Sequence, residues 1–402
     1  MSQKQENLIV VLDVGSAHTR VLAADLNEGA LRYRTHAVVE SQGMRKGLIS
    51  ELGPAARCVK LASDQAERNV RSVIDECTVG VGGPNILGVN TTAGLNFGAK
   101  MREISADDVS IAVERARGVT LAPDREILHL LTRQFVLDDQ PGIHDPVGMV
   151  GSRLEVDLHM STCSGGAMQS IVTCANRAGL EVTDTVFEAL ASAEATLTPD
   201  ERELGVCVLD IGAHSTELVV FFEGAVAHTA SIPFGGHHFT NDLAVVLEMP
   251  VAQAEQVKLR WGHTVVTAVP QLDEIEIRNP HPTMIRHRLV AEILEPRARE
   301  LFDMVRRSLR DGGVLGALGM GCVLTGGGAV LPGLMDVTES ILHVRTRIGL
   351  PVQLSRMPPE LMHPQYSALV GLMLYAHRKR VTRTAENNSL RAKLRAIFAA
   401  SL

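Results

Sequence analysis

Two short segments of the chain decide its fold: Val11-Leu12-Asp13-Val14-Gly15 and, nearly half a chain later, Val208-Leu209-Asp210-Ile211-Gly212. Each segment ends an apolar run and continues into small and hydroxylic residues before the chain becomes apolar again. This pattern predicts a strand, a tight turn that carries a carboxylate, and a returning strand. Because the pattern occurs twice, it indicates two similar domains that face one ligand. A carboxylate beside backbone N–H groups freed by glycine suits a metal-chelated polyphosphate.

Composition places the chain among ordinary globular proteins. Its 402 residues have room for two or more domains, with 45% hydrophobic and 21% charged residues. The net charge of −7, one Trp and three Tyr give no reason to expect nucleic acid as a partner. The apolar stretch at residues 8–12 is too short for a signal peptide, and no run reaches the roughly 20 apolar residues of a membrane span. The six cysteines lack metal-ligand spacing, so we expect free thiols in a reducing cytoplasm.

The order of expected elements follows from periodicity and from breakers such as glycine and proline. A change of pattern at residues 85–162 indicates an inserted subdomain, with a helix capped at Ser105 and strands around Phe135 and Val156. The other expected elements are three strands within 8–38, a helix over 51–72, a strand at 77–81, helices over 168–178 and 186–196, a strand directly after Pro199-Asp200, a helical block over 240–312, a strand at 322–325 and a helix over 366–377.

A triple glycine is the third feature with chemical meaning. Thr325-Gly326-Gly327-Gly328 ends an apolar strand and would let the backbone pass close to a planar ring or a phosphate. A tight strand-to-helix turn is the alternative explanation. Glu255 and Lys258 are three residues apart and share one helix face, where a solvated ion pair is the simplest interpretation.

Taken together, these elements resemble the actin-like ATPase superfamily, which includes actin, heat-shock chaperone ATPases and sugar kinases. Residues 10–25 and 206–221 look like its two phosphate segments, and residues 323–334 look like its adenosine segment. Residues 175–191 and 368–375 look like its two connecting helices. Within the superfamily the chain looks most like the FtsA family, the bacterial cell-division actin homologues. That closer match rests on Gly43-Met44-Arg45-Lys46-Gly47, residues 254–262, Leu294-Glu295-Pro296-Arg297, Arg347-Ile348-Gly349-Leu350-Pro351 and the C-terminal tail.

The resemblance covers essentially the whole chain. It implies an α/β actin-like fold: two duplicated domains, each with a central mixed sheet, around a nucleotide cleft, plus a family-specific inserted subdomain. The implied division is 1–84 and 163–200 for the first domain, 85–162 for the insert, 201–240 and 315–380 for the second domain, 241–314 for a small subdomain, 381–388 for a linker and 389–402 for an amphipathic helix.

The resemblance also implies ATP and Mg²⁺ as ligands. Asp13 and Asp210 would flank Mg²⁺, mostly through water. The expected nucleotide-binding residues are Gly15, Ser16, Ala17 and His18 in the first turn, Gly212, Ala213, His214 and Ser215 in the second, and Gly236, Glu255, Lys258, Gly326, Gly327 and Gly328 around adenosine.

Two positions depart from the family pattern. The second turn lacks its usual later glycine, and His18 stands where relatives often have lysine. These changes weaken the expectation of hydrolysis more than that of binding, so at most weak ATPase activity is expected. His214 either contacts a phosphate or is a structural histidine with satisfied hydrogen bonds, and the sequence favours the structural role.

The family implies partners as well. The small subdomain would bind the C-terminal peptide of the tubulin homologue FtsZ, with Arg297 as the contact residue, and the insert would contribute to filaments of the chain itself. Other divisome membrane proteins are further expected partners. The alternative for the arginines of this helix is a solvated face: Arg297, Arg299, Arg306, Arg307 and Arg310.

The C-terminal tail has the pattern of a membrane-surface helix. Leu390, Leu394, Ile397 and Phe398 form one apolar stripe, and the flanking basic residues are Arg391, Lys393 and Arg395. Residues 378–388 are polar and unpatterned, as in a flexible linker, which argues against the alternative of a helix docked on the body. We therefore expect the tail to bind an anionic membrane surface. The resemblance implies that this surface is the cytoplasmic face of the bacterial inner membrane at the division septum.

Two other functions belong to the same superfamily. A soluble phosphotransferase needs a catalytic carboxylate in the cleft, and the sequence offers no convincing one. A chaperone-like ATPase needs a substrate-binding domain, for which no segment is available.

Overall fold

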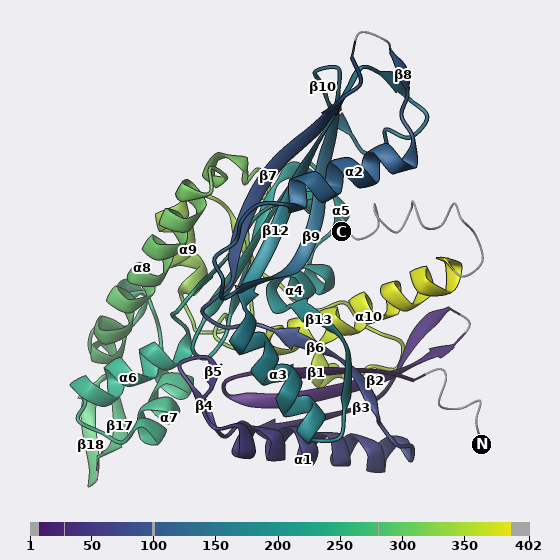
Figure 1. The fold of residues 1–402 in the computed structure, drawn as a ribbon. Coiled ribbons are helices and arrows are strands. Elements are labelled where there is room, and N and C mark those ends of the chain that lie inside the picture. Colours follow the sequence, from purple (N-terminus) through teal and green to yellow (C-terminus); the bar gives the residue numbers. More distant parts are fainter. Residues whose placement is uncertain (1–7, 28, 99–100, 280, 387–402) are drawn as a thin grey trace.

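The computed structural model describes residues 8–27, 29–98, 101–279 and 281–386. Figure 1 shows a first domain built on one sheet, a second domain beside it, and an insert that projects away from both. The first sheet has the order β13-β6-β1-β2-β3. Its strands are β1 (Leu8–Val14), β2 (His18–Asn27), β3 (Ala30–Glu40), β6 (Glu76–Val81) and β13 (Glu181–Phe187).

Strand β1 is buried on both faces, which explains its continuous apolar sequence. Val10 and Leu12 pack toward helices α1 (Leu52–Val70) and α3 (Gly165–Arg177). Ile9 and Val11 pack on the opposite side against α4 (Glu188–Thr196) and α10 (Ser367–Glu386). The sheet is therefore the middle layer of a three-layer domain.

The second domain and the insert share one continuous nine-stranded sheet, in the order β10-β9-β12-β7-β16-β15-β14-β19-β20. The second-domain strands are β14 (Val206–Ile211), β15 (Thr216–Phe222), β16 (Ala225–Ile232), β19 (Cys322–Thr325) and β20 (Thr346–Ile348). The insert contributes β7 (Leu87–Asn96), β9 (Arg125–Leu137), β10 (Gln140–Ile143) and β12 (Arg153–Ser164), with α2 (Ala106–Arg117) and the pair β8 (Arg102–Glu103) and β11 (Val150–Gly151).

Only one residue pair, Ala230 with Leu87, joins the two halves of this sheet. Beside it lies a buried polar network in which His159 Nε2 is 2.8 Å from Thr229 Oγ1 and His159 Nδ1 is 2.6 Å from Asn90 Oδ1. Burial lowers the pKa of His159 to about 3, so this imidazole is neutral at physiological pH. The insert thus lies between two first-domain segments in the sequence, but it is hydrogen-bonded to the second domain.

The small subdomain corrects one prediction. Residues 240–312 are not a helical block, because a hairpin separates α6 (Gly236–Val246) and α7 (Val251–Trp261) from α8 (His287–Asp311). The hairpin consists of β17 (Glu274–Asn279) and β18 (His281–Arg286), whose alternating Ile275 and Ile277 are buried in the core below. Period-two alternation over so few residues is hard to distinguish from a helix face. Helix α9 (Leu334–Leu342) follows the triple glycine and packs on α8.

Three other boundaries differ from the expected ones. Val186 belongs to β13, so α4 begins at Glu188. A short helix, α5 (Pro199–Leu204), with a capping box at Thr198 precedes β14, which therefore does not follow Pro199-Asp200 directly. Helix α10 continues to Glu386, so the predicted linker is helical up to that residue. The remaining elements are β4 (Met44–Arg45), β5 (Leu48–Ile49) and 3₁₀ turns at Val266–Ala268, Leu315–Ala317, Pro359–Leu361 and Pro364–Tyr366.

The basic residues at the end of α10 explain why this helix does not stop early. Arg378 pairs with Glu194 at 2.8 Å, Lys379 pairs with Asp184, and Arg380 donates to the carbonyl of Leu8 at 3.0 Å. Their side chains were predicted to be part of a solvated linker, and tertiary ion pairs hold them on the first domain instead. In the part of the chain that the structure describes, no helix is long and apolar enough to cross a membrane.

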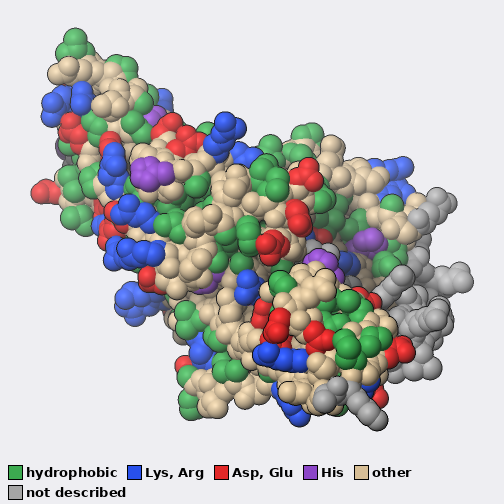
Figure 2. All heavy atoms as spheres, turned by 90° about the horizontal axis from the view of Figure 1, so that it is seen from above, with side chains coloured by type: hydrophobic (Ala, Val, Ile, Leu, Met, Phe, Trp, Pro, Cys, Tyr) green, Lys and Arg blue, Asp and Glu red, His purple; other side chains and the backbone are tan. Residues whose placement is uncertain are grey.

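The surface charge is mixed. Figure 2 shows basic and acidic side chains interspersed over one face of the molecule. All six cysteines are buried and free, as the sequence predicts.

Candidate functional site

The first turn, between β1 and β2, carries Asp13. This carboxylate is buried and pairs with Arg20 of the returning strand at 3.0 Å. Ser41 of the next strand connection holds the turn, because its hydroxyl donates to the carbonyl of Gly15 at 2.7 Å and its amide to that of Ala17 at 2.9 Å. The carbonyl groups of the turn are thus occupied, and Ala17 is exposed.

The second turn, between β14 and β15, carries Asp210 in the same position. Its carboxylate accepts a hydrogen bond from Ser192 of α4. Burial raises the pKa of Asp210 to about 6, the Asp13 carboxylate adds to this, and the Ser192 hydrogen bond opposes it. The mutual electrostatic effect shows that the two turns approach each other, as the duplicated segments predict. Ser215 is buried and closes the turn by accepting from the amide of Gly212 at 2.9 Å.

Within the described residues, the amides of Ser16, Ala17, Ala213 and His214 donate to no backbone or side-chain acceptor. Backbone N–H groups that converge in a turn form a concave anion site. These four amides are among those that the sequence assigns to phosphates.

The triple glycine lies directly against the second turn. Gly326 has φ +83°, and a Cβ added there would lie 2.3 Å from Asp210 Oδ1, so only glycine fits. Gly328 donates its amide to the carbonyl of Ile211 at 2.8 Å. Gly327 is exposed, with only Gln365 near its Cβ position at 3.8 Å. One edge of the triple glycine therefore packs on the carboxylate strand and the other stays open for a ligand.

Glu255, Lys258 and Gly236 come together beside the second turn. Lys258 Nζ is 2.8 Å from Glu255 Oε2 and donates to the carbonyl of Gly236 at 3.0 Å. Thr240 of α6 contacts both charged groups, donating to Glu255 and accepting from Lys258 at 2.8 Å. The pair is a partly buried ion pair that ties α7 to α6, which goes beyond the solvated pair that the spacing alone indicates.

Two glutamates beside the turns were not expected in the site. Glu188, the partly accessible first residue of α4, and Glu217, the buried second residue of β15, converge on Gly82, where a Cβ would lie 2.4 Å from Glu188 Oε2 and 2.5 Å from Glu217 Oε1. Glu217 accepts from the amide of Gly83 at 2.6 Å, and its buried Oε2 has no hydrogen-bond partner within the described part of the chain. The sequence offered no convincing catalytic carboxylate, and the structure corrects this expectation. A glutamate inside the wholly buried strand β15 was the available signal.

The electrostatics of these glutamates follow from their surroundings. Burial raises the pKa of Glu188 well above its usual range, and the carboxylates of Asp13, Glu217 and Asp210 add to the effect. Burial likewise raises the pKa of Glu217 well above its usual range, with Asp210 as the next cause. The carboxylates of Asp13 and Asp210 thus raise the pKa of both glutamates.

We expect Glu217→Gln to stabilise the ligand-free protein at pH 8. A carboxyl group with a raised pKa favours folding at pH values below its ordinary pKa, and that contribution is lost as the pH rises through the folded-state pKa. The amide cannot ionise, so the variant should gain about 1–3 kcal/mol at pH 8 and little at pH 5. Thermal unfolding at both pH values checks this, with the exposed Glu276→Gln as the matched control. A variant that is less stable than the wild type at pH 8 would contradict it.

The two histidines of the turns lie in different settings. Burial and Arg20 lower the pKa of His18. Burial and two neighbouring histidines, His237 and His238, lower the pKa of His214. His214 Nδ1 is buried and has no hydrogen-bond partner among the described residues. The expected structural histidine with satisfied hydrogen bonds is thus not what the structure shows.

Arg297, the predicted partner-binding residue, is occupied within the chain. It forms a two-pronged pair with Asp242 of α6, through its Nε and through Nη2 at 2.7 Å, and its Nη1 is 2.5 Å from Glu300. Arg299 and Arg306 also have carboxylate neighbours on α8. The predicted membrane residues, Leu390, Arg391, Lys393, Leu394, Arg395, Ile397 and Phe398, lie outside the described residues.

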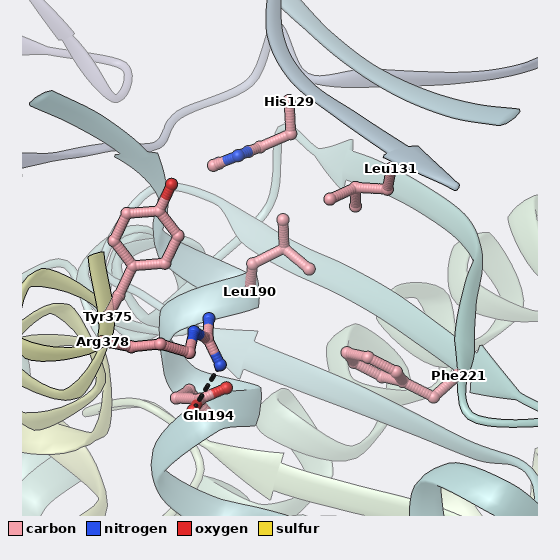
Figure 3. A pocket seen from close by; sticks show the side chains of 7 residues that line it. All are labelled: His129, Leu131, Leu190, Glu194, Phe221, Tyr375 and Arg378. Atoms are coloured by element: carbon pink, nitrogen blue, oxygen red, sulfur yellow. Dashed lines mark hydrogen bonds and ion pairs between the residues drawn. The ribbon is translucent and has the colours of Figure 1, made fainter. Parts of the chain in front are cut away.

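A pocket lies apart from the two turns, where the insert, the second domain and α10 meet. Figure 3 shows its lining residues: His129, Leu131, Leu190, Glu194, Phe221, Tyr375 and Arg378. His129 accepts from the amide of Phe187 at 2.9 Å, and burial lowers its pKa to about 4. The lining is mostly apolar and its charged groups, Arg378 and Glu194, are paired, so this pocket has the features of a packing junction.

The fold recurs in known structures of low sequence identity. The PilM-PilN type IV pilus biogenesis complex matches with TM-score 0.64 and 17% identity, covering 92% of this chain and 98% of that chain. MreB5 of Spiroplasma citri bound to ADP matches with TM-score 0.56 and 16% identity, covering 95% and 99%. Together with the two facing turns, these matches define the class: the chain has the actin-like ATPase fold with an inserted domain, as the sequence predicts.

Sequence comparison identifies the family. The model for cell division protein FtsA matches residues 207–371, and that for the SHS2 domain inserted in FtsA matches residues 83–162. A cell division protein FtsA of Pseudomonas aeruginosa is 34% identical over 94% of this chain and 91% of that protein. Those of Borreliella burgdorferi and Escherichia coli are each 32% identical, over 98% and 94% of this chain and 98% and 92% of those proteins. The chain belongs to the FtsA family of cell-division proteins.

Proposed function

We propose that the chain binds ATP with Mg²⁺ between its two turns. The observation that carries this proposal is the convergence of Asp13, Asp210 and the exposed edge of the triple glycine on one cleft. No group of three or more protein ligands in metal geometry occurs among the described residues, so Mg²⁺ would keep water and phosphate oxygens as most of its ligands. Two hard carboxylates on facing turns fit that requirement.

The positions of the two unexpected glutamates support a role in ATP hydrolysis. Glu188 is partly accessible and Glu217 is buried directly behind it. A carboxylate held near the phosphate side of the cleft can orient a water molecule or accept its proton. We propose Glu188 as the residue that positions water in slow ATP hydrolysis, with Glu217, anchored by the amide of Gly83, as its neighbour across Gly82.

At the cellular level, we propose an adaptor of cell division. The chain would self-associate in its ATP-bound form, bind the C-terminal peptide of FtsZ on the small subdomain, and attach these filaments to the inner face of the cytoplasmic membrane through residues 389–402. It would also help to recruit later divisome membrane proteins. Family membership and the amphipathic tail pattern support this proposal. Arg297 is held by its pair with Asp242. A peptide carboxylate would replace its second contact, the one with Glu300.

Asp210→Asn tests the nucleotide site. Removing a carboxylate that acts on Mg²⁺ through water should weaken Mg²⁺-dependent ATP binding about 10–100-fold. In the wild type, the Mg²⁺-dependent part of the affinity should also fall when the pH drops below the Asp210 pKa of about 6, because metal ligands must be deprotonated. Calorimetric titration with ATP, with and without Mg²⁺, measures both effects.

The exposed Asp107→Asn in the insert is the matched control and should bind as the wild type does. A wild-type protein that binds no ATP at either pH would refute the proposed function. Equal affinity in Asp210→Asn and wild type would remove Asp210 from the site.

A further inference from the structure

His214 and His237 form a tilted pair of rings beside the second turn. Their ring centroids are 4.8 Å apart with an interplanar angle of 34°. His214 belongs to the turn itself, and His237 belongs to the first turn of α6. Two backbone hydrogen bonds join these segments, from the amide of His237 to the carbonyl of Ala213 at 2.7 Å and from Gly236 to Gly212 at 2.9 Å. The pair is therefore fixed on the same backbone that carries the candidate phosphate amides.

The pair also lies at the boundary with the first domain. A Cβ added to Gly47 would be 3.8 Å from the Cβ of His214. Gly47 lies in the connection between β4 and β5, which approaches the second turn across the cleft. The His214 side chain is therefore placed to contact a ligand bound between the two domains.

The hydrogen bonding of His214 differs from that of His159 and His129. Both ring nitrogens of His159 are bonded, and His129 accepts from a backbone amide. By contrast, His214 Nδ1 is buried without a partner among the described residues. An unpaired buried polar atom is unfavourable, so a ligand that supplies its partner is favoured.

Without a ligand, the charges around the pair oppose protonation of its rings. On α6 the groups facing it are His237 and His238, and on α7 they are Lys258 and Glu255. Burial lowers the pKa of His237, Lys258 lowers it further and Glu255 opposes this. The rings are thus neutral near pH 7 without ligand. A polyphosphate brings several negative charges, which favour the imidazolium form.

We propose that His214 and His237 contact the terminal phosphate of the bound nucleotide as a protonated pair, so that the protein takes up protons on binding a nucleoside triphosphate and prefers it to the diphosphate. This inference rests on the proposed nucleotide site and adds two specificity-determining side chains to it. His214 stands in the turn that lacks the later glycine of the family pattern, and His237 lies against it from α6.

The sign of the pH effect follows from linkage. The ligand-bound state holds more protons, so affinity for the triphosphate should rise as the pH falls from 8.5 to 6.5, by up to about tenfold per pH unit for each proton taken up. This direction is opposite to the effect expected from Asp210, whose carboxyl group weakens Mg²⁺ binding only near and below pH 6. The two titrations are therefore separable.

Isothermal titration calorimetry of the full chain with ATPγS or ADP, both with excess Mg²⁺, tests the inference. Titrations in two buffers of different ionisation enthalpy measure the protons taken up. The wild type should take up more protons with ATPγS than with ADP at pH 7.5. The double variant His214→Gln/His237→Gln should lose this difference and lower the affinity ratio of ATPγS to ADP about tenfold.

The exposed His144→Gln in the insert is the matched control and should behave as the wild type does. Thermal unfolding shows whether each variant is folded, and the single variant His237→Gln provides the test if the double variant is not. A folded variant with wild-type proton uptake and affinity ratio would overturn the inference. A wild type that binds neither ATPγS nor ADP would refute the proposed nucleotide site itself.

Discussion

Gly371→Ala should lower the free energy of unfolding by more than about 3 kcal/mol, the upper range for overpacking at a rigid contact. Gly371 lies on α10, where this helix crosses α4, and an added Cβ would lie 1.7 Å from the carbonyl oxygen of Ala191. The obstacle is helix backbone, so no side-chain rotation can relieve the clash. The helices would have to separate, which opens the buried layer beneath the first sheet.

The displacement should also reach the cleft. Helix α4 carries both Glu188 and Ser192, and Ser192 donates its hydroxyl to Asp210. A shift of α4 therefore disturbs the second turn, and ATP binding should weaken in any Gly371→Ala protein that still folds. Gly371→Val should give mostly insoluble protein.

Gly53→Ala is the matched control for this substitution. Gly53 also lies in a helix, α1, but it is exposed, and a Cβ there meets only Arg57 at an ordinary 3.7 Å. The change should stabilise the protein by about 0.4–1 kcal/mol, because alanine restricts the unfolded chain. Thermal unfolding and soluble yield of the two variants measure the contrast. Equal stability of Gly371→Ala and wild type would mean that the helices do not cross as described.

A chain that ends at Glu386, or one with Phe398→Asp, should lose binding to anionic liposomes while still binding ATP. Burying the four large apolar side chains of the tail contributes roughly 6–12 kcal/mol. Ordering about 14 residues costs about 1–2 kcal/mol each in backbone entropy, and basic residues return about 1 kcal/mol each near anionic lipid. One tail is therefore marginal, and removing one anchor residue should abolish attachment.

Several tails in a filament would bind far more strongly than one tail, without new contacts. We therefore expect liposome co-sedimentation of the full chain to rise steeply with protein concentration and with ATP. Leu272→Asp, at a fully exposed apolar side chain outside the tail, introduces a similar change and is the control for added charge. Unchanged co-sedimentation of the truncated chain would remove the tail from the proposal.

Much of the fold could be predicted because its signals are local. The strand, turn and returning strand around Asp13 and Asp210 are each formed by adjacent residues, and the antiparallel pairing of the two strands repeats at both sites. The capped helix after Ser105 has both hydrogen bonds of its capping box. The predictions for residues 274–286 and for the end of α10 were wrong, because contacts with distant residues decide both structures. Residues 274–286 form strands because Ile275 and Ile277 are buried in a core shared with α8. Helix α10 continues past Arg378 because this residue is held by an ion pair with Glu194.

The sequence by itself determined the two carboxylate turns, the triple glycine and the family, because each depends on residues that are neighbours in the chain. Only the tertiary structure decided what surrounds these turns. Glu188 and Glu217 meet at Gly82 because β13, which leads into α4, ends beside β6. His214 lies against His237 because the first turn of α6 is hydrogen-bonded to the second turn. Such contacts join residues far apart in the chain, and their effects on charge and burial exist only when the chain is folded.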